Sequence, residues 1–299
     1  MRYHWQILDA GPLALDGGGM FGVVPKVLWE KVAPPDERNR ITLTHNCLLL
    51  KPEDGGPPVL IETGSGDKFD AKMKAIFGLG ERSIVTALTE AGQNATAIAT
   101  VVATHLHFDH AGGLTRLPLD SETPDWTAGD ESTCLTFPNA KVVVQRQEWE
   151  DAVANRSVMT RTYLPSHLDP IREQLELVDT PLPSDAELPT TEVRPGIEVF
   201  RVPGHTWGQQ AVKFADTDGR TVVFVPDVIP TVHHVGDAYS MSYDVEPYTN
   251  MLTRKRLLAD ALERDWTLVL DHEPNTPVVK VTKDDRGKYQ LVPQEKDSA

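Results

Sequence analysis

His105-Leu-His107-Phe-Asp109-His110 places three imidazoles and one carboxylate within six residues, directly after the apolar, β-branched run 97–104. Histidine and aspartate are costly to bury unless they are paired or bound to a metal. Neutral imidazole and carboxylate are ligands of divalent ions such as zinc, iron, cobalt and manganese. The segment therefore predicts a metal site at the end of a buried strand.

The spacing within this segment indicates how its side chains are presented. In an extended chain alternate side chains point to one side, so His105, His107 and Asp109 would share a face. His110 breaks the alternation and joins the others only if the backbone turns, for which the glycines of segment 111–113 supply flexibility. Ligands on both sides of a turn suit two adjacent ions better than one.

The composition is that of a globular protein with a substantial core. Of the 299 residues, 40% are apolar and 24% are charged, and the length allows one large domain or two ordinary ones. The formal net charge of -15 disfavours nucleic acid and anionic membrane surfaces as partners. The basic run 254–256 is short, and we expect it on a solvated helix face.

Neither the cysteines nor the first residues indicate export or a membrane anchor. Cys47 and Cys134 lack metal-ligand spacing and are predicted to be free thiols. Residues 1–6 do not begin a signal peptide, and no apolar run approaches the length of a membrane span. We therefore expect a cytoplasmic protein.

Strands and helices alternate through both halves of the chain, which favours one layered structure over two independent domains. Apolar spacing predicts helices at 83–91 and 251–263. We expect a single domain, 1–299, with surface insertions near 117–139 and 180–195 that are either functional walls or tolerated excursions. Strands are predicted at 41–50, 59–63, 97–104, 141–145, 196–202, 210–214, 221–226 and 267–271.

Other metal-ligand residues follow predicted strands in the same way as His105 does. His205, Asp227 and His272 each come just after a strand-like apolar run. Strand ends at one sheet edge lie close together, and loops there build sites on a rigid scaffold. Each residue alone would be read as a turn or cap, but four strand ends supplying His, His, Asp and His favour a shared metal site.

These patterns resemble a known family over most of the chain. The segment 60–67 resembles the early strand-turn motif of the metallo-β-lactamase superfamily, with Glu62 where aspartate is common. The resemblance implies an α+β fold, a four-layer αββα sandwich with helices outside two facing sheets and metals at one edge. The ligand series of the superfamily is matched by segment 105–110, Gly204-His205-Thr206, Asp227 and His272.

The resemblance also implies a ligand set for two divalent ions. Zinc is the expected metal, and iron, cobalt and manganese are alternatives. The implied ligands are His105, His107 and His205 for the first ion, Asp109, His110 and His272 for the second, and Asp227 as a bridge together with a hydroxide.

A dinuclear centre of this kind indicates hydrolysis. Two ions about 3.5–4 Å apart lower the pKa of a bridging water and polarise a carbonyl or phosphoryl oxygen. The sequence has no serine-nucleophile elbow, and Ser65 is interpreted as part of a turn. We expect the bridging hydroxide to attack a lactone or ester carbonyl, with Asp109 as the catalytic group that passes the proton to the leaving alkoxide.

A closer resemblance concerns the substrate. Segments 16–29 and 227–244 resemble quorum-quenching N-acyl-homoserine lactonases and their methyl-parathion-hydrolase-like relatives. This implies a lactonase for N-acyl-homoserine lactones, and it suggests a homodimer. An organophosphate or aryl-ester hydrolase on the same scaffold is the alternative.

Four residues are predicted to contact the substrate. The glycine-rich loop 16–22 would bring Met20 and Phe21 over an acyl-binding pocket, or these side chains would pack in the core. His234 either contacts the substrate or belongs to a structural pair with its neighbour His233. Some lactonases have a tyrosine where this chain has Pro230, and Tyr243 or Tyr239 would replace it.

Overall fold

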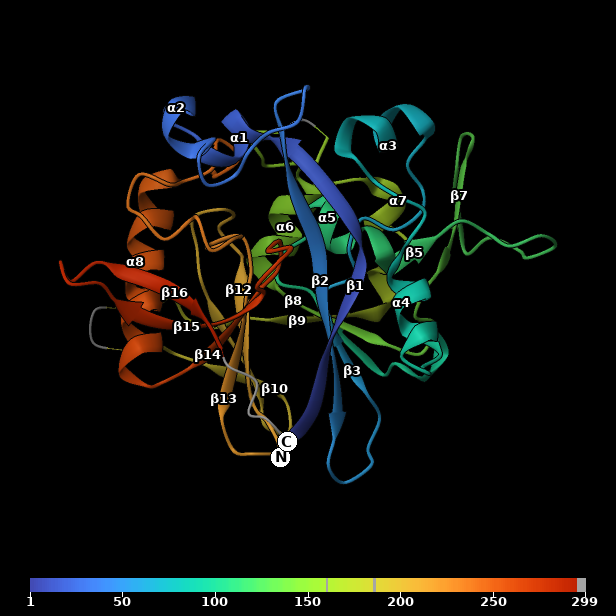
Figure 1. Ribbon diagram of the computed structural model, residues 1–299. Helices are drawn as coiled ribbons and strands as arrows, with labels where there is room; N and C mark the ends of the chain where they lie inside the picture. Colours follow the sequence, from blue (N-terminus) through green and yellow to red (C-terminus); the bar gives the residue numbers. More distant parts are fainter. Residues whose placement is uncertain (160, 185–186, 295–299) are drawn as a thin grey trace.

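Two mixed β-sheets face each other between outer helices in the computed structural model, which describes residues 1–159, 161–184 and 187–294 (Figure 1). This arrangement matches the four-layer α+β sandwich expected from the sequence. Several strands of both sheets end at the same edge of this sandwich, and the candidate site lies at that edge.

The first sheet carries the segment 105–110. Three adjacent strands of this sheet, β3, β4 and β8, run parallel to one another, so their C-terminal ends lie at the same edge. His105 follows β4 at this edge. The strand order is β1 (Tyr3–Asp16), β2 (Arg40–Pro52), β3 (Val59–Ile61), β4 (Thr100–Val102), β8 (Lys141–Gln145) and β9 (Leu175–Val178).

The second sheet supplies the other candidate ligands. Strands β11 and β13 are both antiparallel to β12, and β14 is parallel to β13, so β11, β13 and β14 end at one edge. His205, Asp227 and His272 follow these three ends. The strand order is β10 (Thr191–Arg194), β11 (Ile197–Arg201), β12 (Gln210–Ala215), β13 (Thr221–Val225), β14 (Thr267–Leu270), β15 (Val278–Lys283) and β16 (Tyr289–Pro293).

The central strands are covered on both faces. On β4, Val102 packs between the sheets against residues of the second sheet, such as Phe224. Its neighbour Val101 packs outward, in a cluster that includes residues of α4 (Ile84–Glu90) and α6 (Arg146–Val153). Because both faces are buried, these strands appear in the sequence as continuous apolar runs.

The outer face of the second sheet is covered by α8 (Pro247–Glu263), at the left of Figure 1. Leu257 and Leu258 of α8 pack in one cluster with Val223 and Leu268 of the sheet. The remaining helices are short: α1 (Gly17–Phe21), α2 (Lys26–Trp29), α3 (Ala71–Phe77), α5 (Phe108–Ala111), α7 (Pro165–Leu168), η1 (Ala95–Ala97), η2 (Gly112–Leu114) and η3 (Arg172–Gln174).

Each predicted strand and helix is present, with its ends shifted by a few residues. The strand predicted at 97–104 is only Thr100–Val102 because η1 occupies Ala95–Ala97, and the helix predicted at 251–263 begins four residues earlier, at Pro247. The sequence did not predict β1, since Gly11 and Pro12 interrupt its pattern. The structure accommodates them at a register shift between Asp9 and Pro12 in the pairing with β2.

The two predicted insertions contain regular structure. Segment 117–139 holds β6 (Trp126–Ala128) and β7 (Glu131–Leu135), which join β5 (Thr115–Arg116) in a small third sheet. The part containing β7 projects from the right-hand side of Figure 1. Segment 180–195 contains β10, which pairs with β11.

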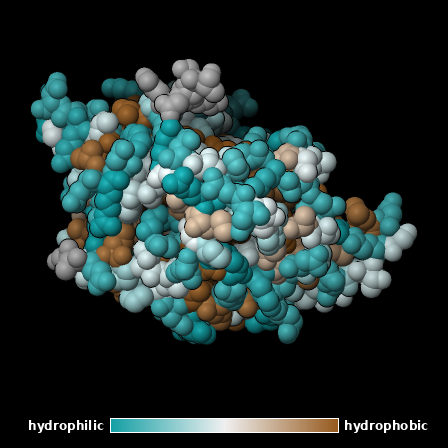
Figure 2. Space-filling view, turned by 90° about the horizontal axis from the view of Figure 1, so that it is seen from below, coloured by the Kyte–Doolittle hydropathy of each residue, from teal (hydrophilic) through white to brown (hydrophobic). Residues whose placement is uncertain are grey.

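The surface in Figure 2 is mostly hydrophilic, with apolar residues in small, separate areas. Within the described part of the chain, no helix has the length and apolar character that crossing a bilayer requires. Cys47 and Cys134 are free, as predicted, and both are buried.

Arg254 corrects the prediction that the basic run lies on a solvated helix face. Its side chain is only 1% exposed, and Nη1 donates to the carbonyl oxygens of His234 and Tyr239 at 3.1 and 2.6 Å. The buried guanidinium therefore ties α8 to the loop that follows Asp227.

Gly112 is required by a close backbone approach, whereas the sequence suggested a flexible turn. Its φ of -59° is ordinary, but a Cβ there would lie 2.2 Å from the carbonyl oxygen of Ser65. We expect Gly112→Ala to lower the free energy of unfolding by about 1–3 kcal/mol, because the backbone must shift. Thermal and denaturant unfolding followed by circular dichroism would measure this.

Gly80→Ala is the matched control, since its Cβ would lie 3.3 Å from the side chain of Pro12 and no closer than 3.9 Å to the backbone nitrogen of Arg82. Equal losses of stability in the two variants would contradict the close-approach explanation.

Candidate metal centre

The segment 105–110 is not extended throughout, which corrects the predicted alternation. Helix α5 begins at Phe108, directly after His107, so Asp109 and His110 lie on a helical turn. This turn brings the ring of His110 to a centroid distance of 3.9 Å from that of His105. Convergence of the histidines thus results from a helix start.

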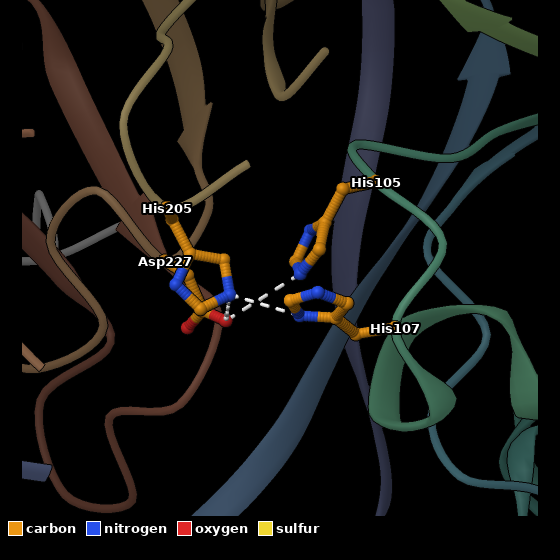
Figure 3. Close-up of side chains that lie close together, drawn as sticks. All are labelled: His105, His107, His205 and Asp227. Carbon is orange, nitrogen blue, oxygen red and sulfur yellow. Dashed lines mark hydrogen bonds and ion pairs between the residues drawn. The ribbon is translucent and has the colours of Figure 1, made fainter. Parts of the chain in front are cut away.

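Four buried side chains converge where the two sheets meet (Figure 3). The ligand atoms of His105, His107, His205 and Asp227 all lie within 4.8 Å of one another. Nδ1 of His107 is 3.0 Å from Nε2 of His205. Oδ2 of Asp227 lies 3.0 Å from Nε2 of His205 and 3.5 Å from Nε2 of His105. We call these four residues the first group.

A second group shares Asp227 and consists of His110, Asp227, Asp271 and His272, again within 4.8 Å. Nε2 atoms of His110 and His272 are 3.3 Å apart, and each is 3.4 Å from an oxygen of Asp227. Asp109, the ligand expected here, has its oxygens 3.7 Å from the same two nitrogen atoms. Asp271 was not predicted.

Hydrogen bonds behind the imidazoles orient them toward the centre. When Nδ1 donates to an acceptor, the lone pair of Nε2 is left free for a metal. Three of the histidines have such an acceptor, and the sequence singled out only one of these acceptors, Glu62 in the 60–67 motif. Nδ1 of His205 is 3.0 Å from Oδ1 of Asp244, and Nδ1 of His110 is 3.0 Å from Oε2 of Glu62. Nδ1 of His272 is 2.9 Å from the carbonyl oxygen of Thr44.

Glu62 occupies the position where the superfamily motif commonly has aspartate. Its φ of 67° is in the left-handed region, which is unusual for a residue with a side chain. Oε2 accepts from His110, and Oε1 accepts from the backbone N–H of Thr104 at 2.5 Å. The carboxylate therefore joins the ends of β3 and β4 and holds one histidine of the second group.

The side chains of the two groups shift the pKa values of one another. Burial, followed by repulsion from neighbouring imidazoles, lowers the pKa of His105 and His107 well below the usual value. Burial also lowers the pKa of His205, but Asp227 and Asp244 outweigh it and raise the pKa to about 10. Burial opposes ionisation of Asp227, yet His205 and His272 hold its pKa well below the usual range.

The donor atoms fit two divalent ions. Nε2 of His105 and Oδ1 of Asp227 are buried and have no hydrogen-bond partner among the described residues. Buried polar atoms without partners are costly, and a cation would compensate them. Imidazole nitrogens and carboxylate oxygens are the donors that zinc and related ions bind.

Glu148 on α6 is a buried carboxylate that supports both histidine segments. Oε1 accepts from the N–H of Leu106 at 3.0 Å and from the hydroxyl of Tyr163 at 3.1 Å. Oε2 accepts from the hydroxyl of Thr206, next to His205, at 2.5 Å. No spacing signal marks Glu148, because Leu106 and Thr206 are 42 and 58 residues away.

A cavity of about 410 Å³ opens onto the two groups. Its floor includes His107, Asp109, His205, Asp227 and His272. Arg161, Thr162 and Tyr243 add polar groups to the wall. The rest of the wall is apolar and consists of Leu15, Met20, Phe77, Phe108, Val158, Met159 and Met241.

Two of the four predicted substrate contacts line this cavity, namely Met20 and Tyr243. The other two do not. Phe21 is fully buried and stacks between Trp29 and His234 at centroid distances of 5.3 and 4.8 Å. His234 is also fully buried, and its Nε2 donates to the carbonyl oxygen of Met20 at 2.9 Å. The expected glycine-rich loop is the helix α1, which directs Phe21 into the core.

Comparison with known proteins identifies the family. Residues 40–272 match the model of the metallo-beta-lactamase superfamily, and the chain belongs to this superfamily. An N-acyl homoserine lactonase from Bacillus thuringiensis is 26% identical over 202 residues, which are 64% of this chain and 66% of that protein. One from Bacillus cereus is 25% identical over 210 residues, or 67% and 69% of the two chains. The chain thus spans just under two thirds of the first relative.

Solved structures share the fold over almost the whole chain. A probable metal-dependent hydrolase from Staphylococcus aureus has a TM-score of 0.81 and 28% identity, with 98% of both chains covered. AidC, a dizinc quorum-quenching lactonase, has a TM-score of 0.73 and 17% identity, with 99% of this chain and 98% of that chain covered. The predicted superfamily and fold are confirmed, and the chain has two neighbouring groups of buried His and Asp side chains that could each hold a metal ion.

Asp227 is the residue shared by both groups, so its loss should affect both ions. We expect Asp227→Ala, after zinc loading and dialysis, to retain one ion or none where the wild-type chain retains two. Metal content would be measured by mass spectrometry of the acid-digested protein.

The control is Asp216→Ala, which removes a carboxylate at the other end of β13 that accepts the N–H of Arg220 at 2.8 Å. Full occupancy of both positions in Asp227→Ala would exclude Asp227 as the bridge.

Proposed function

We propose that this hydrolase opens lactone rings, with N-acyl-homoserine lactones as its preferred substrates. The observation that supports this most strongly is the mostly apolar cavity directly above the two His/Asp groups. Such a cavity accommodates an acyl chain while the lactone carbonyl reaches the groups on the floor. The names of the Bacillus relatives, at 25–26% identity, support the same substrate class.

Two divalent ions, when bound, would supply a water of lowered pKa and polarise the carbonyl oxygen of the lactone. Zinc is the expected ion for both positions, since imidazole and carboxylate suit it well, although iron, cobalt and manganese accept the same donors. The residues proposed to hold them are His105, His107 and His205 at one position, Asp109, His110 and His272 at the other, and Asp227 at both.

Asp109 is positioned to move a proton during the reaction. It lines the cavity, is 8% exposed and has its oxygens 3.7 Å from Nε2 of His110 and His272. Its carboxylate would take one proton from the attacking water and deliver it to the ring oxygen as the ester bond breaks. The oxygen of the water becomes part of the new carboxylate, the ring oxygen leaves as a hydroxyl, and the second proton of the water is released to solvent.

Tyr243 is the polar wall group best suited to contact the substrate. Burial, followed by the charges of Asp16 and Asp109, raises its pKa to about 12, so the hydroxyl remains a hydrogen-bond donor at neutral pH. Gly19 leaves room for it, because a Cβ there would be 2.1 Å from the hydroxyl oxygen. Tyr239 packs edge-on against Phe21, at 6.0 Å, and is not among the described residues that line the cavity.

The substrate proposal is tested by comparing kcat/KM for three substrate classes with zinc-loaded protein. These are homoserine lactones of increasing acyl length, aryl esters and a paraoxon-type phosphotriester. We expect kcat/KM for the lactones to exceed that for the other two classes by at least about 100-fold. We also expect kcat/KM to rise with acyl length, because a longer chain buries more apolar surface against the wall. A preference for the phosphotriester by orders of magnitude would instead identify an organophosphate hydrolase.

Removing the hydroxyl of Tyr243 tests its contact with the substrate. We expect Tyr243→Phe to lower kcat/KM for the best lactone by about tenfold, with metal content unchanged, because one hydrogen bond to the substrate is lost. Tyr239→Phe is the matched control and should behave like the wild type. Wild-type kinetics in Tyr243→Phe would show that the hydroxyl does not assist the reaction.

A further inference from the structure

Asp271 is a buried carboxylate that the proposed reaction does not use. Its side chain is 2% exposed, and neither Oδ1 nor Oδ2 has a hydrogen-bond partner in the described parts of the chain. A carboxyl group in such surroundings is unfavourable unless a cation or a proton compensates it. The neighbourhood of Asp271 indicates which of the two is present.

The position of Asp271 relative to the second group is that of a metal ligand. One of its oxygens lies within 4.8 Å of the ligand atoms of His110, Asp227 and His272. Oδ2 is 3.9 Å from Nε2 of His272. Donor atoms at 2.0–2.2 Å from one ion lie roughly 3–4 Å from each other, so this spacing is compatible with a shared ion.

Asp271 and Asp109 differ in their surroundings. Both border a small interior space next to Cys47 and Glu62, but only Asp109 also lines the large cavity. The backbone of Asp271 is fixed because its carbonyl oxygen accepts the N–H of Asn46 at 2.8 Å. The carboxylate is therefore presented to the second group from within the protein.

We propose that Asp271 is an additional ligand of the ion held by the second group. This inference rests on the proposed two-ion centre. The second ion then has three carboxylates in reach, from Asp109, Asp227 and Asp271, together with two imidazoles. The first ion has three imidazoles and the shared Asp227.

This asymmetry has two consequences. Carboxylate oxygens suit manganese better than imidazole nitrogens do, so the second position should favour manganese more than the first position does. Asp109 also becomes less necessary for holding the ion, which leaves its carboxylate available to exchange a proton with the substrate.

A neutral acid is the competing role for Asp271, in which a protonated carboxyl donates a hydrogen bond to Asp227 and only positions it. Asp271→Asn separates the two roles, because the amide keeps the shape and a donor but loses the charge. Metal-free wild type, Asp271→Asn and the control Asp216→Asn would be titrated with Zn²⁺ and with Mn²⁺ against a competing chelator.

We expect Asp271→Asn to bind the first ion with wild-type affinity and the second ion at least about tenfold more weakly, with a larger loss for Mn²⁺ than for Zn²⁺. Affinity for the second ion within twofold of wild type, for both metals, would assign Asp271 the positioning role and overturn the proposal. A wild-type chain that binds only one ion would overturn the two-ion centre and the proposed function with it.

A crystal structure of the metal-loaded wild type provides a test that does not depend on the variant folding. An Asp271 oxygen about 2.0–2.2 Å from the second ion is the expected result. A distance beyond about 3 Å would overturn the proposal while leaving the two-ion centre intact.

Discussion

The site depends on one electrostatic constraint: imidazole lone pairs and carboxylates are buried together where two sheets meet, and they need positive charge. The first sheet brings the segment 105–110 to this edge, and the second brings His205, Asp227 and His272. Neither half of the donor set can satisfy an ion alone. Binding of cations and packing of the two sheets should therefore stabilise each other, as in other metal sites that form only in the folded state.

Three buried carboxylates hold the ligand segments in place, and each also binds backbone. Glu62 accepts the N–H of Thr104, Glu148 accepts that of Leu106, and Asp244 accepts that of Met241. Glu62 and Asp244 orient a histidine at the same time. A single carboxylate thus couples the course of a loop to the direction of a ligand, and the floor of the cavity is rigid because backbone and ligand cannot move independently.

The sequence predicts which histidines gather with Asp227, because residue type and strand ends are local signals. Of the supporting residues it singles out only Glu62, since pairs such as His205 and Asp244 are 39 residues apart and meet only in the fold. The alternation of side chains expected for an extended chain placed Asp109 and His107 on one face. It is wrong because a helix starts at Phe108 and changes the period. Asp271 gave no signal of its own, being the last residue of a predicted apolar strand.

Floor and wall of the cavity are built by different kinds of structure. The floor comes from segments that follow strand ends of both sheets. Most of the wall comes from other elements, which supply Leu15, Met20, Phe77, Val158, Met159, Arg161, Thr162, Met241 and Tyr243. Successive residues of a helix point in different directions, so Met20 reaches the cavity while Phe21 stacks in the core. Wall residues other than Phe108, which lies within the ligand segment, can therefore change without disturbing the donor atoms. The choice between a lactone and a phosphotriester is then a property of the wall, and metal binding is a property of the floor.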